Sequence, residues 1–250
     1  MAGGSWACMT TVIKVGGSIL EPEPKPQLIA ALARQAEIGP LVVVHGGGKT
    51  LTALLARLGI ASEFRDGLRV TGAEALRAAI MAFAGSVNTA LVAALNAAGV
   101  RAVGLTGCDA GCVRAVAQAG LGAVGGSARA DPRLLRSLLA SGFTPVLASL
   151  ALDAAGAGIL NVNADQFAAA IATALGAERL LFLTDVNGVL DTRGQTVPQA
   201  TLAELRALAM SGALRGGMLP KTAACVTALE AGVREVSILG PGGAGTQLSL

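Results

Sequence analysis

Short apolar runs alternate along this chain with longer segments whose apolar residues recur at helical spacing. Several of the runs are almost continuously hydrophobic, which is typical of strands buried on both faces of a parallel sheet. The runs cover residues 11–15, 41–44, 101–105, 144–148, 179–184 and 235–239. Helices are predicted at about 26–38, 50–58, 73–97, 131–141, 165–175, 201–211 and 219–231. This alternation predicts an α/β fold with a largely parallel central sheet.

The composition limits both the core and the classes of partner. Hydrophobic residues occupy 53% of the 250 positions but aromatic residues only 2%, so the core must be built from Ala, Val, Leu and Ile. The net charge of +3 is small, and no basic tract occurs. Without basic tracts and stacking aromatic side chains, the sequence predicts no nucleic-acid surface, whereas small anionic substrates remain compatible.

The four cysteines, at positions 8, 108, 112 and 225, are too few and too scattered for a disulfide framework. Cys108 and Cys112 lack a second pair, and the single histidine, His45, is distant in sequence, so free buried thiols and no protein metal site are expected. The N-terminus lacks the charged and apolar regions of a signal peptide. A cytoplasmic location is therefore expected.

Residues 78–100 carry no charge and are long enough to cross a bilayer. However, Ser86, Asn88, Thr89 and Asn96 interrupt this run, and Ala, which dominates it, contributes little to membrane insertion. We therefore expect a helix of a folded core that also offers a candidate subunit interface, and no membrane association.

A glycine turn in the stretch 41–59 resembles a phosphate-binding loop because it ends in Gly48-Lys49-Thr50 and opens a helix. The first glycine of that loop pattern would fall at Val43, inside the strand. The turn is also too short to wrap a phosphate. What remains is a helix start that favours a carboxylate or a phosphate without distinguishing them.

The dinucleotide-binding pattern G-x-G-x-x-G occurs at 120–125 and at 240–245. The first occurrence lacks the acidic residue expected about twenty positions later, and the second leaves too few residues for the required helix. Both are predicted to be hairpin or turn glycines. Short alternation over residues 112–127 predicts a β-hairpin.

Several charged residues occupy positions in predicted strands, helix starts or turns that raise the question of a functional role. Lys14 lies in an apolar strand, where a charge is costly unless it snorkels to solvent or has a partner. Lys221 lies at a helix start, where the dipole disfavours a cation unless an anionic ligand binds. For Asp165 and Asp185, helix capping and turn formation are alternatives to a functional role.

Eight segments, taken in order, resemble the N-acetyl-L-glutamate kinases of the amino-acid kinase superfamily. They are "IKVGGS", "VVVHGGGKTL", "DGLRVT", "AGSVNTALVAALNAAG", "VGLTGCD", "NVNADQ", "LTDVNGVLD" and "GGMLPKTAACVTALEAGV", and the resemblance spans residues 11–250. Kinases of carrier-protein-bound aminoadipate or glutamate are the nearest alternative, and their motifs differ at HGGG and NVNAD.

The resemblance implies a three-layer αβα sandwich. Residues 1–175 would form an N-terminal lobe for acyl amino acid binding and dimerisation, and residues 176–250 a nucleotide-binding lobe. The implied activity is phosphorylation of the γ-carboxylate of N-acetyl-L-glutamate, a step of arginine biosynthesis, with ATP and Mg²⁺. A homodimer through the helix at 73–97 is also implied. A kinase of another acyl amino acid and a non-catalytic acyl-amino-acid-binding paralogue remain alternatives.

The resemblance also assigns roles to residues. Lys14 and Lys221 would stabilise the transferred phosphoryl group, and Asp165 would hold both lysines, whereas Lys49 would take no part in catalysis. The implied substrate-binding residues are Gly47, Gly48, Arg69, Asn161 and Asn163. The implied nucleotide-binding residues are Gly16, Gly17, Thr184, Asp185, Val186, Gly188, Val189, Leu190, Leu214, Arg215, Gly217 and Met218. No carboxylate cluster for Mg²⁺ is evident, so the ion is expected on the oxygens of ATP and water.

The sequence departs from the family pattern in two places. Only residues 1–10 precede the first strand, whereas arginine-inhibited members carry an added N-terminal helix that builds a hexamer. An arginine-insensitive dimer is therefore expected. The segment between the strand at 235–239 and the final Gly-Thr is also short, so the nucleotide lobe is expected to be trimmed on its adenine side.

Overall fold

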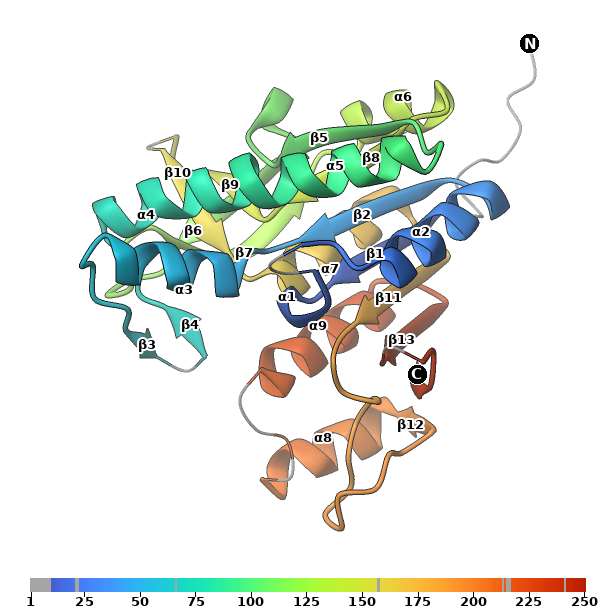
Figure 1. Cartoon of the computed structure of the whole chain (residues 1–250). Helices are drawn as coiled ribbons and strands as arrows, with labels where there is room; N and C mark the ends of the chain where they lie inside the picture. The colour runs from blue at the N-terminus through green and yellow to red at the C-terminus, as the bar shows by residue number, and fades with distance from the viewer. Residues whose placement is uncertain are drawn as a thin grey trace.

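In the computed structural model, an eight-stranded sheet carries helices on both faces (Figure 1). The structure describes residues 10–20, 23–65, 67–156, 158–212, 214, 217–240 and 242–250. From edge to edge, the strands are β12 (Gln199–Thr201), β14 (Gly245–Ser249), β13 (Glu235–Leu239), β11 (Arg179–Leu183), β1 (Thr11–Val15), β2 (Leu41–His45), β8 (Thr144–Ala148) and β5 (Ala102–Thr106). In this sheet only β13 and β14 pair antiparallel, which confirms the predicted, largely parallel arrangement.

Alternate side chains of the central strands enter two different hydrophobic clusters, so the sheet is the middle layer. In β1, Val12 belongs to one cluster, whereas Ile13 and Val15 belong to the other. One face is covered by α1 (Gly17–Leu20), α2 (Pro26–Ile38) and α5 (Asn88–Ala97). The other is covered by α6 (Arg133–Ala140), α7 (Ala164–Leu175), α8 (Leu202–Met210) and α9 (Met218–Glu230). The predicted αβα sandwich is therefore confirmed.

A second group of four strands, β6 (Val113–Ala117), β7 (Val124–Ala130), β9 (Leu150–Asp153) and β10 (Ile159–Val162), closes on itself and packs on α7. The antiparallel pair β6–β7 confirms the predicted hairpin. The glycines of the two dinucleotide-like patterns belong to hairpins and turns: Gly122 has a φ of 69° between β6 and β7, and Gly125 lies in β7 of that hairpin. The Gly240 N–H donates to the Ala244 carbonyl at 2.8 Å between β13 and β14. A two-stranded sheet, β3 (Phe64–Arg65) and β4 (Leu68–Arg69), was not predicted.

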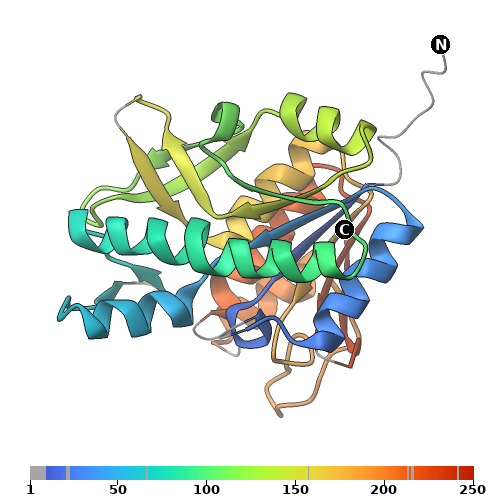
Figure 2. The same ribbon diagram turned by 45° about the horizontal axis from the view of Figure 1, so that its top comes forward.

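The predicted helix at 73–97 is one continuous element that crosses in front of the sheet in Figure 2. It consists of α4 (Ala73–Ile80), the π-helical turn η2 (Met81–Val87) and α5. By length and hydropathy it could span a membrane, but 44% of its most apolar window is buried. Its inner face packs on α2, α3 (Gly48–Arg57), β5 and β8, as a core helix does, while Met81 on its outer face is 61% exposed.

Two predicted helix starts are resolved in detail. Helix α8, predicted from residue 201, begins with a capping box: Thr201 Oγ1 accepts from the Glu204 N–H at 3.3 Å, and the Glu204 carboxylate accepts from the Thr201 N–H at 2.7 Å. Helix α6 begins at Arg133, two residues later than predicted. Asp131 still bonds this helix start, because its carboxylate accepts the Arg133 N–H at 3.0 Å.

Candidate active site

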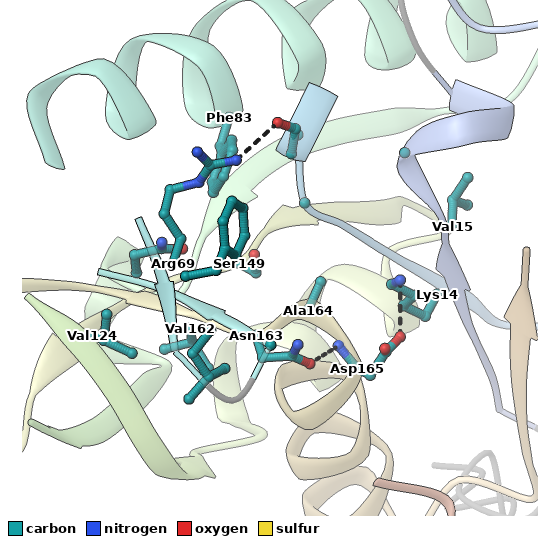
Figure 3. Close-up of a pocket in the computed structure, with 18 residues that line it drawn as sticks. Lys14, Val15, Arg69, Phe83, Val124, Ser149, Val162, Asn163, Ala164 and Asp165 are labelled. Carbon is teal, nitrogen blue, oxygen red and sulfur yellow. Dashed lines mark hydrogen bonds and ion pairs between the residues drawn. The ribbon is translucent and has the colours of Figure 1, made fainter. Parts of the chain in front are cut away.

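The carboxyl ends of β1 and β2 and the start of α7 surround a pocket of about 220 Å³ (Figure 3). Ligands of open parallel sheets bind at this edge. The pocket is lined by Lys14, Val15, Gly17, Gly46, Gly47, Gly48, Phe64, Gly67, Leu68, Arg69, Phe83, Val124, Ser149, Asn161, Val162, Asn163, Ala164 and Asp165. Pockets for drug-sized ligands span roughly 300–1,000 Å³, so this one suits a smaller molecule.

Lys14 and Asp165 line one end of the pocket and belong to a buried cluster of three charges, whose third member is Lys221. Lys14 Nζ, from β1, lies 2.8 Å from Asp165 Oδ1, and Lys221 Nζ, from α9, lies 3.0 Å and 3.2 Å from the two Asp165 carboxylate oxygens. Asp165 and Lys221 are only 5% and 6% exposed. Because a buried charge is costly without a partner, the three groups depend on one another.

The cluster holds more positive than negative charge. Burial alone would raise the pKa of Asp165, but the adjacent Lys14 and Lys221 outweigh it and lower that pKa below its ordinary value. The pKa of Lys221 is itself lowered, first by burial and then by the charge on Lys14, against the attraction of Asp165. An anion placed beside the lysines would relieve this imbalance.

Helix capping at the start of α7 falls to Asn163 rather than to Asp165. The Asn163 Oδ1 accepts the backbone N–H groups of Asp165 at 2.9 Å and Gln166 at 3.3 Å. The capping alternative for Asp165 was therefore wrong, and its carboxylate is left to bind the lysines. The other predicted amide, Asn161, lines the pocket and donates from Nδ2 to Thr71 Oγ1 at 3.2 Å.

Arg69 stands at the opposite end of the pocket and is 8% exposed. Its guanidinium donates to Thr52 Oγ1 at 2.7 Å and to the Gly48 carbonyl at 3.3 Å, contacts the Ser62 hydroxyl, and lies 4.5 Å from the Phe64 ring centroid. Burial lowers the pKa of Arg69. None of the ion pairs between described residues includes Arg69, so its charge is available to a bound anion.

The glycine turn, Gly46 to Gly48, joins β2 to α3 along the pocket wall. A Cβ at Gly47 would lie 2.5 Å from Phe83 Cδ1, whereas a Cβ at Gly48 would meet nothing within 4 Å. Phe83 is only 4% exposed, so Gly47 leaves it the space that it needs. Lys49 is exposed and does not line the pocket.

The single histidine ends β2 directly beneath this turn and is fully buried. His45 Nδ1 lies 2.6 Å from the Gly46 carbonyl oxygen, and His45 Nε2 lies 2.8 Å from Asn88 Nδ2. Burial lowers the pKa of His45 to about 4, and the bond to Gly46 offsets that only in part. The ring is therefore neutral at pH 7.

The predicted nucleotide residues after β11 divide into exposed and buried ones. Thr184 Oγ1 donates to Asp185 Oδ1 at 3.2 Å, and Val186 and Leu190 are 38% and 40% exposed. Val189 is fully buried in the hydrophobic core, so its side chain is closed to a ligand.

Four further residues were predicted to bind the nucleotide near the start of α9, and one, Gly188, in the segment after β11. Leu214 is 4% exposed and belongs to the core, while Gly217 precedes α9 and Met218 begins it. Gly188 has a φ of 91°, and a Cβ there would lie 2.5 Å from Thr246 Oγ1. Arg215 lies outside the described residues.

The two glycines after β1 differ in their backbone bonding. The Gly16 N–H donates to the Leu183 carbonyl at 2.8 Å and so continues the ladder between β1 and β11. A phosphate contact through this N–H would have to displace that bond. Gly17 begins α1 and lines the pocket, so its backbone is the better-placed donor.

Some pocket residues escaped the sequence analysis. Ser149, which is 1% exposed, follows β8, and the rule that ligands bind at carboxyl strand ends could have indicated it. Phe83 lies in the π-helical turn of the long helix, where no local pattern marks it. Thr52 and Ser62 matter only because the fold brings them to Arg69.

The part of the chain that the structure describes contains no group of three His, Cys, Asp or Glu placed to hold a metal ion. Cys108, Cys112 and Cys225 are free, and burial raises the pKa of Cys112 to about 11. The prediction of free buried thiols is confirmed for Cys112 and Cys225, whereas Cys108 is free but only half-buried. Cys8 lies outside the described residues.

Comparison with known proteins relates this chain to one family of kinases. Residues 9–240 match the model of the "Amino acid kinase family". The acetylglutamate kinase of Afipia carboxidovorans is 44% identical over 247 residues, covering 92% of this chain and 83% of that protein. The acetylglutamate kinase of Solibacter usitatus is 46% identical over 242 residues, covering 94% and 92%. The solved structure of smu.665 from Streptococcus mutans has a TM-score of 0.87 at 28% identity, covering 96% of this chain and 98% of that one.

Burial of His45 makes stability depend on pH. The unfolded chain protonates this ring near pH 6.5, whereas the folded protein does so only near pH 4. Stability should therefore fall as the pH drops from 6.5 towards 4, by about 3 kcal/mol in total. Urea unfolding across this range measures the slope, and His45→Gln should flatten it. The same slope in both proteins would assign the pH dependence to other groups.

Proposed function

Because this chain belongs to the amino acid kinase family, and to the acetylglutamate kinases within it, we infer that it transfers a phosphoryl group from ATP to the γ-carboxylate of N-acetyl-L-glutamate. The comparisons confirm the family, the kinase activity and the place in arginine biosynthesis that the sequence predicted. The roles of individual residues, of the two lobes and of a dimer are our proposals.

The observation that supports these roles is the buried cluster of Lys14, Asp165 and Lys221. Its Lys14 and Asp165 line one end of the pocket, and Arg69 lines the other end. An acylated dicarboxylic amino acid has one carboxylate for each end. We assign the α-carboxylate to Arg69 and the γ-carboxylate to the end beside the lysines. Gly47, Gly48, Asn161 and Asn163 would bind the substrate between them.

The acceptor needs no general base. A γ-carboxyl group has an ordinary pKa of about 4.3 and is ionised at neutral pH. The barrier lies instead in bringing two anions together and in the charge that develops on the phosphoryl oxygens, so positioning and electrostatics dominate. Lys14 and Lys221 would supply the positive charge, and Asp165 would keep both ammonium groups oriented.

The nucleotide would bind on the lobe formed by residues 176–250, together with Gly16 and Gly17. In support, the described residues that line the acceptor pocket all lie at or before Asp165, while most of the predicted nucleotide residues follow β11. The described residues contain no group of three or more His, Cys, Asp or Glu placed to hold a metal ion. The ion would be held by ATP oxygens and water, where it neutralises phosphate charge.

A coupled assay of ADP release tests the activity. The wild type should release ADP when N-acetyl-L-glutamate is added, and Lys221→Ala should reduce kcat by roughly 10²–10³-fold, because one preorganised donor to the transition state is lost. Absence of acetylglutamate-dependent turnover in the wild type would favour the non-catalytic paralogue. Faster turnover of glutamate, aspartate, carbamate or a carrier-protein-bound acyl amino acid than of N-acetyl-L-glutamate would change the substrate assignment.

Two substitutions two positions apart, at Gly47 and at Lys49, test the role of the glycine turn. Gly47→Ala forces a methyl group against Phe83 and should raise KM for the acyl substrate at least about tenfold. Lys49→Ala, on the exposed side of the same turn, should leave kcat and KM within about twofold of wild type. Loss of turnover in Lys49→Ala would show that the lysine, and not the turn backbone, serves the reaction.

We also propose a cytoplasmic homodimer through the outer face of the helix at 73–97. Met81 is 61% exposed on this face, and the small residues Gly85 and Ser86, one helical turn further along, are exposed beside it. Met81→Glu should raise the dimer dissociation constant at least about tenfold, because the contact would bury an unpaired charge. Sedimentation equilibrium measures it, with Met210→Glu, an 89% exposed methionine on α8, as the control. A monomeric wild type would exclude the dimer.

A further inference from the structure

The glycine turn between β2 and α3 has no side chains of its own to hold its backbone. Glycine peptides adopt many conformations, so donors presented by such a turn need support from elsewhere. We propose that His45 is a positioning residue of the acceptor site: its ring, itself held by Asn88, fixes the Gly46–Gly47 peptide so that the Gly47 N–H is presented to the acyl substrate. This inference rests on the proposed function, because that substrate is what the turn would bind.

The hydrogen bonds around the ring admit one arrangement. The Gly46 carbonyl can only accept, so His45 Nδ1, at 2.6 Å, must carry the hydrogen. In the neutral ring, Nε2 then accepts, and Asn88 Nδ2 donates to it at 2.8 Å. The second hydrogen of this amide goes to the Val146 carbonyl at 2.9 Å. Turning the Asn88 amide over would set its oxygen against that carbonyl, so the amide orientation, and with it the tautomer of His45, is determined.

Peptide geometry connects the ring to the pocket. In a trans peptide, the carbonyl of one residue and the N–H of the next point in opposite directions. The Gly46 carbonyl is directed to the buried ring, so the Gly47 N–H is directed away from it. Gly46, Gly47 and Gly48 all line the pocket. A backbone donor fixed in this way needs no reorganisation when an anion binds.

Asn88 is anchored independently of the turn. It begins α5, directly after the π-helical turn, and is 5% exposed. A Cβ at Gly104, on β5, would collide with Asn88 Oδ1, so the amide side chain sits against a strand that leaves space for it. The support of the glycine turn therefore reaches through His45 to the long helix and to two strands of the sheet.

Two substitutions separate the two bonds of the ring. In His45→Asn the side-chain amide nitrogen stands near the place of Nδ1 and can still donate to Gly46. In His45→Gln the terminal amide stands near the place of Nε2, so contact with Asn88 survives while the donor to Gly46 is lost. We expect His45→Gln to raise KM for N-acetyl-L-glutamate about tenfold with KM for ATP within about twofold, and His45→Asn to restore the former to within about threefold.

Hydrogen exchange of the substrate-free protein gives a readout that needs no activity. Amides of the turn should exchange at least about fivefold faster in His45→Gln than in the wild type or in His45→Asn, while amides of β1 and β11 stay unchanged. Asn88→Ala should resemble His45→Gln. Its matched control is Asn96→Ala. Like Asn88, Asn96 donates from the long helix to a strand carbonyl, in its case that of Ala102 on β5 at 3.0 Å, but its hydrogen bonds do not involve the ring.

The outcomes are distinct. Equal rises in both KM values, or turn exchange that is the same in His45→Gln and His45→Asn, would overturn the positioning role. A wild type without acetylglutamate turnover would overturn the proposed function alone, since the exchange rates still report on the turn. If His45→Gln does not fold, the comparison of Asn88→Ala with Asn96→Ala decides by the same exchange measurement.

Discussion

One carboxylate, that of Asp165, joins two lysines that lie far apart in the sequence. Lys14 comes from the first strand and Lys221 from the last long helix, and both reach Asp165 within 3.0 Å at the start of α7. None of the three charges could remain buried without the others. Their mutual dependence ties β1, α7 and α9 together at the edge of the sheet where ligands bind, so the rest of the pocket is built around a fixed point.

The same cluster is unfavourable for the stability of the free protein but favourable for binding anionic reactants. Two cations around one anion leave an excess of positive charge, and after burial itself the charge on Lys14 is what lowers the pKa of Lys221. A phosphoryl group and a carboxylate are complementary to that excess, so the free protein retains an imbalance that the reacting groups would relieve. Backbone donors in the glycine turn add attraction for anions without adding further charge to the interior.

Local patterns predicted much of the fold. The central strands could be found because β1, β2, β8, β11 and β13 are nearly continuous apolar runs, and the long helix because its apolar spacing extends over several turns. Strands β3, β4, β9 and β10 have only two to four residues, too short for any periodicity to be recognised. The π-helical turn could not be predicted from the spacing of apolar residues, since it is a local change in backbone hydrogen bonding. It contains Phe83, which packs against Gly47.

By itself, the amino-acid sequence determined the layered α/β architecture, the family and the residue types that the reaction needs, because these follow from periodicity and from motifs of neighbouring residues. Only the tertiary structure decided which side chains meet. It made Asn163 the cap and Asp165 the partner of two lysines, bound the Gly16 N–H to Leu183, buried Val189 and Leu214, and placed Asn88 against a histidine 43 positions away. Such contacts join segments that are distant in the chain, and their distances and burial arise only when the helices pack on the sheet.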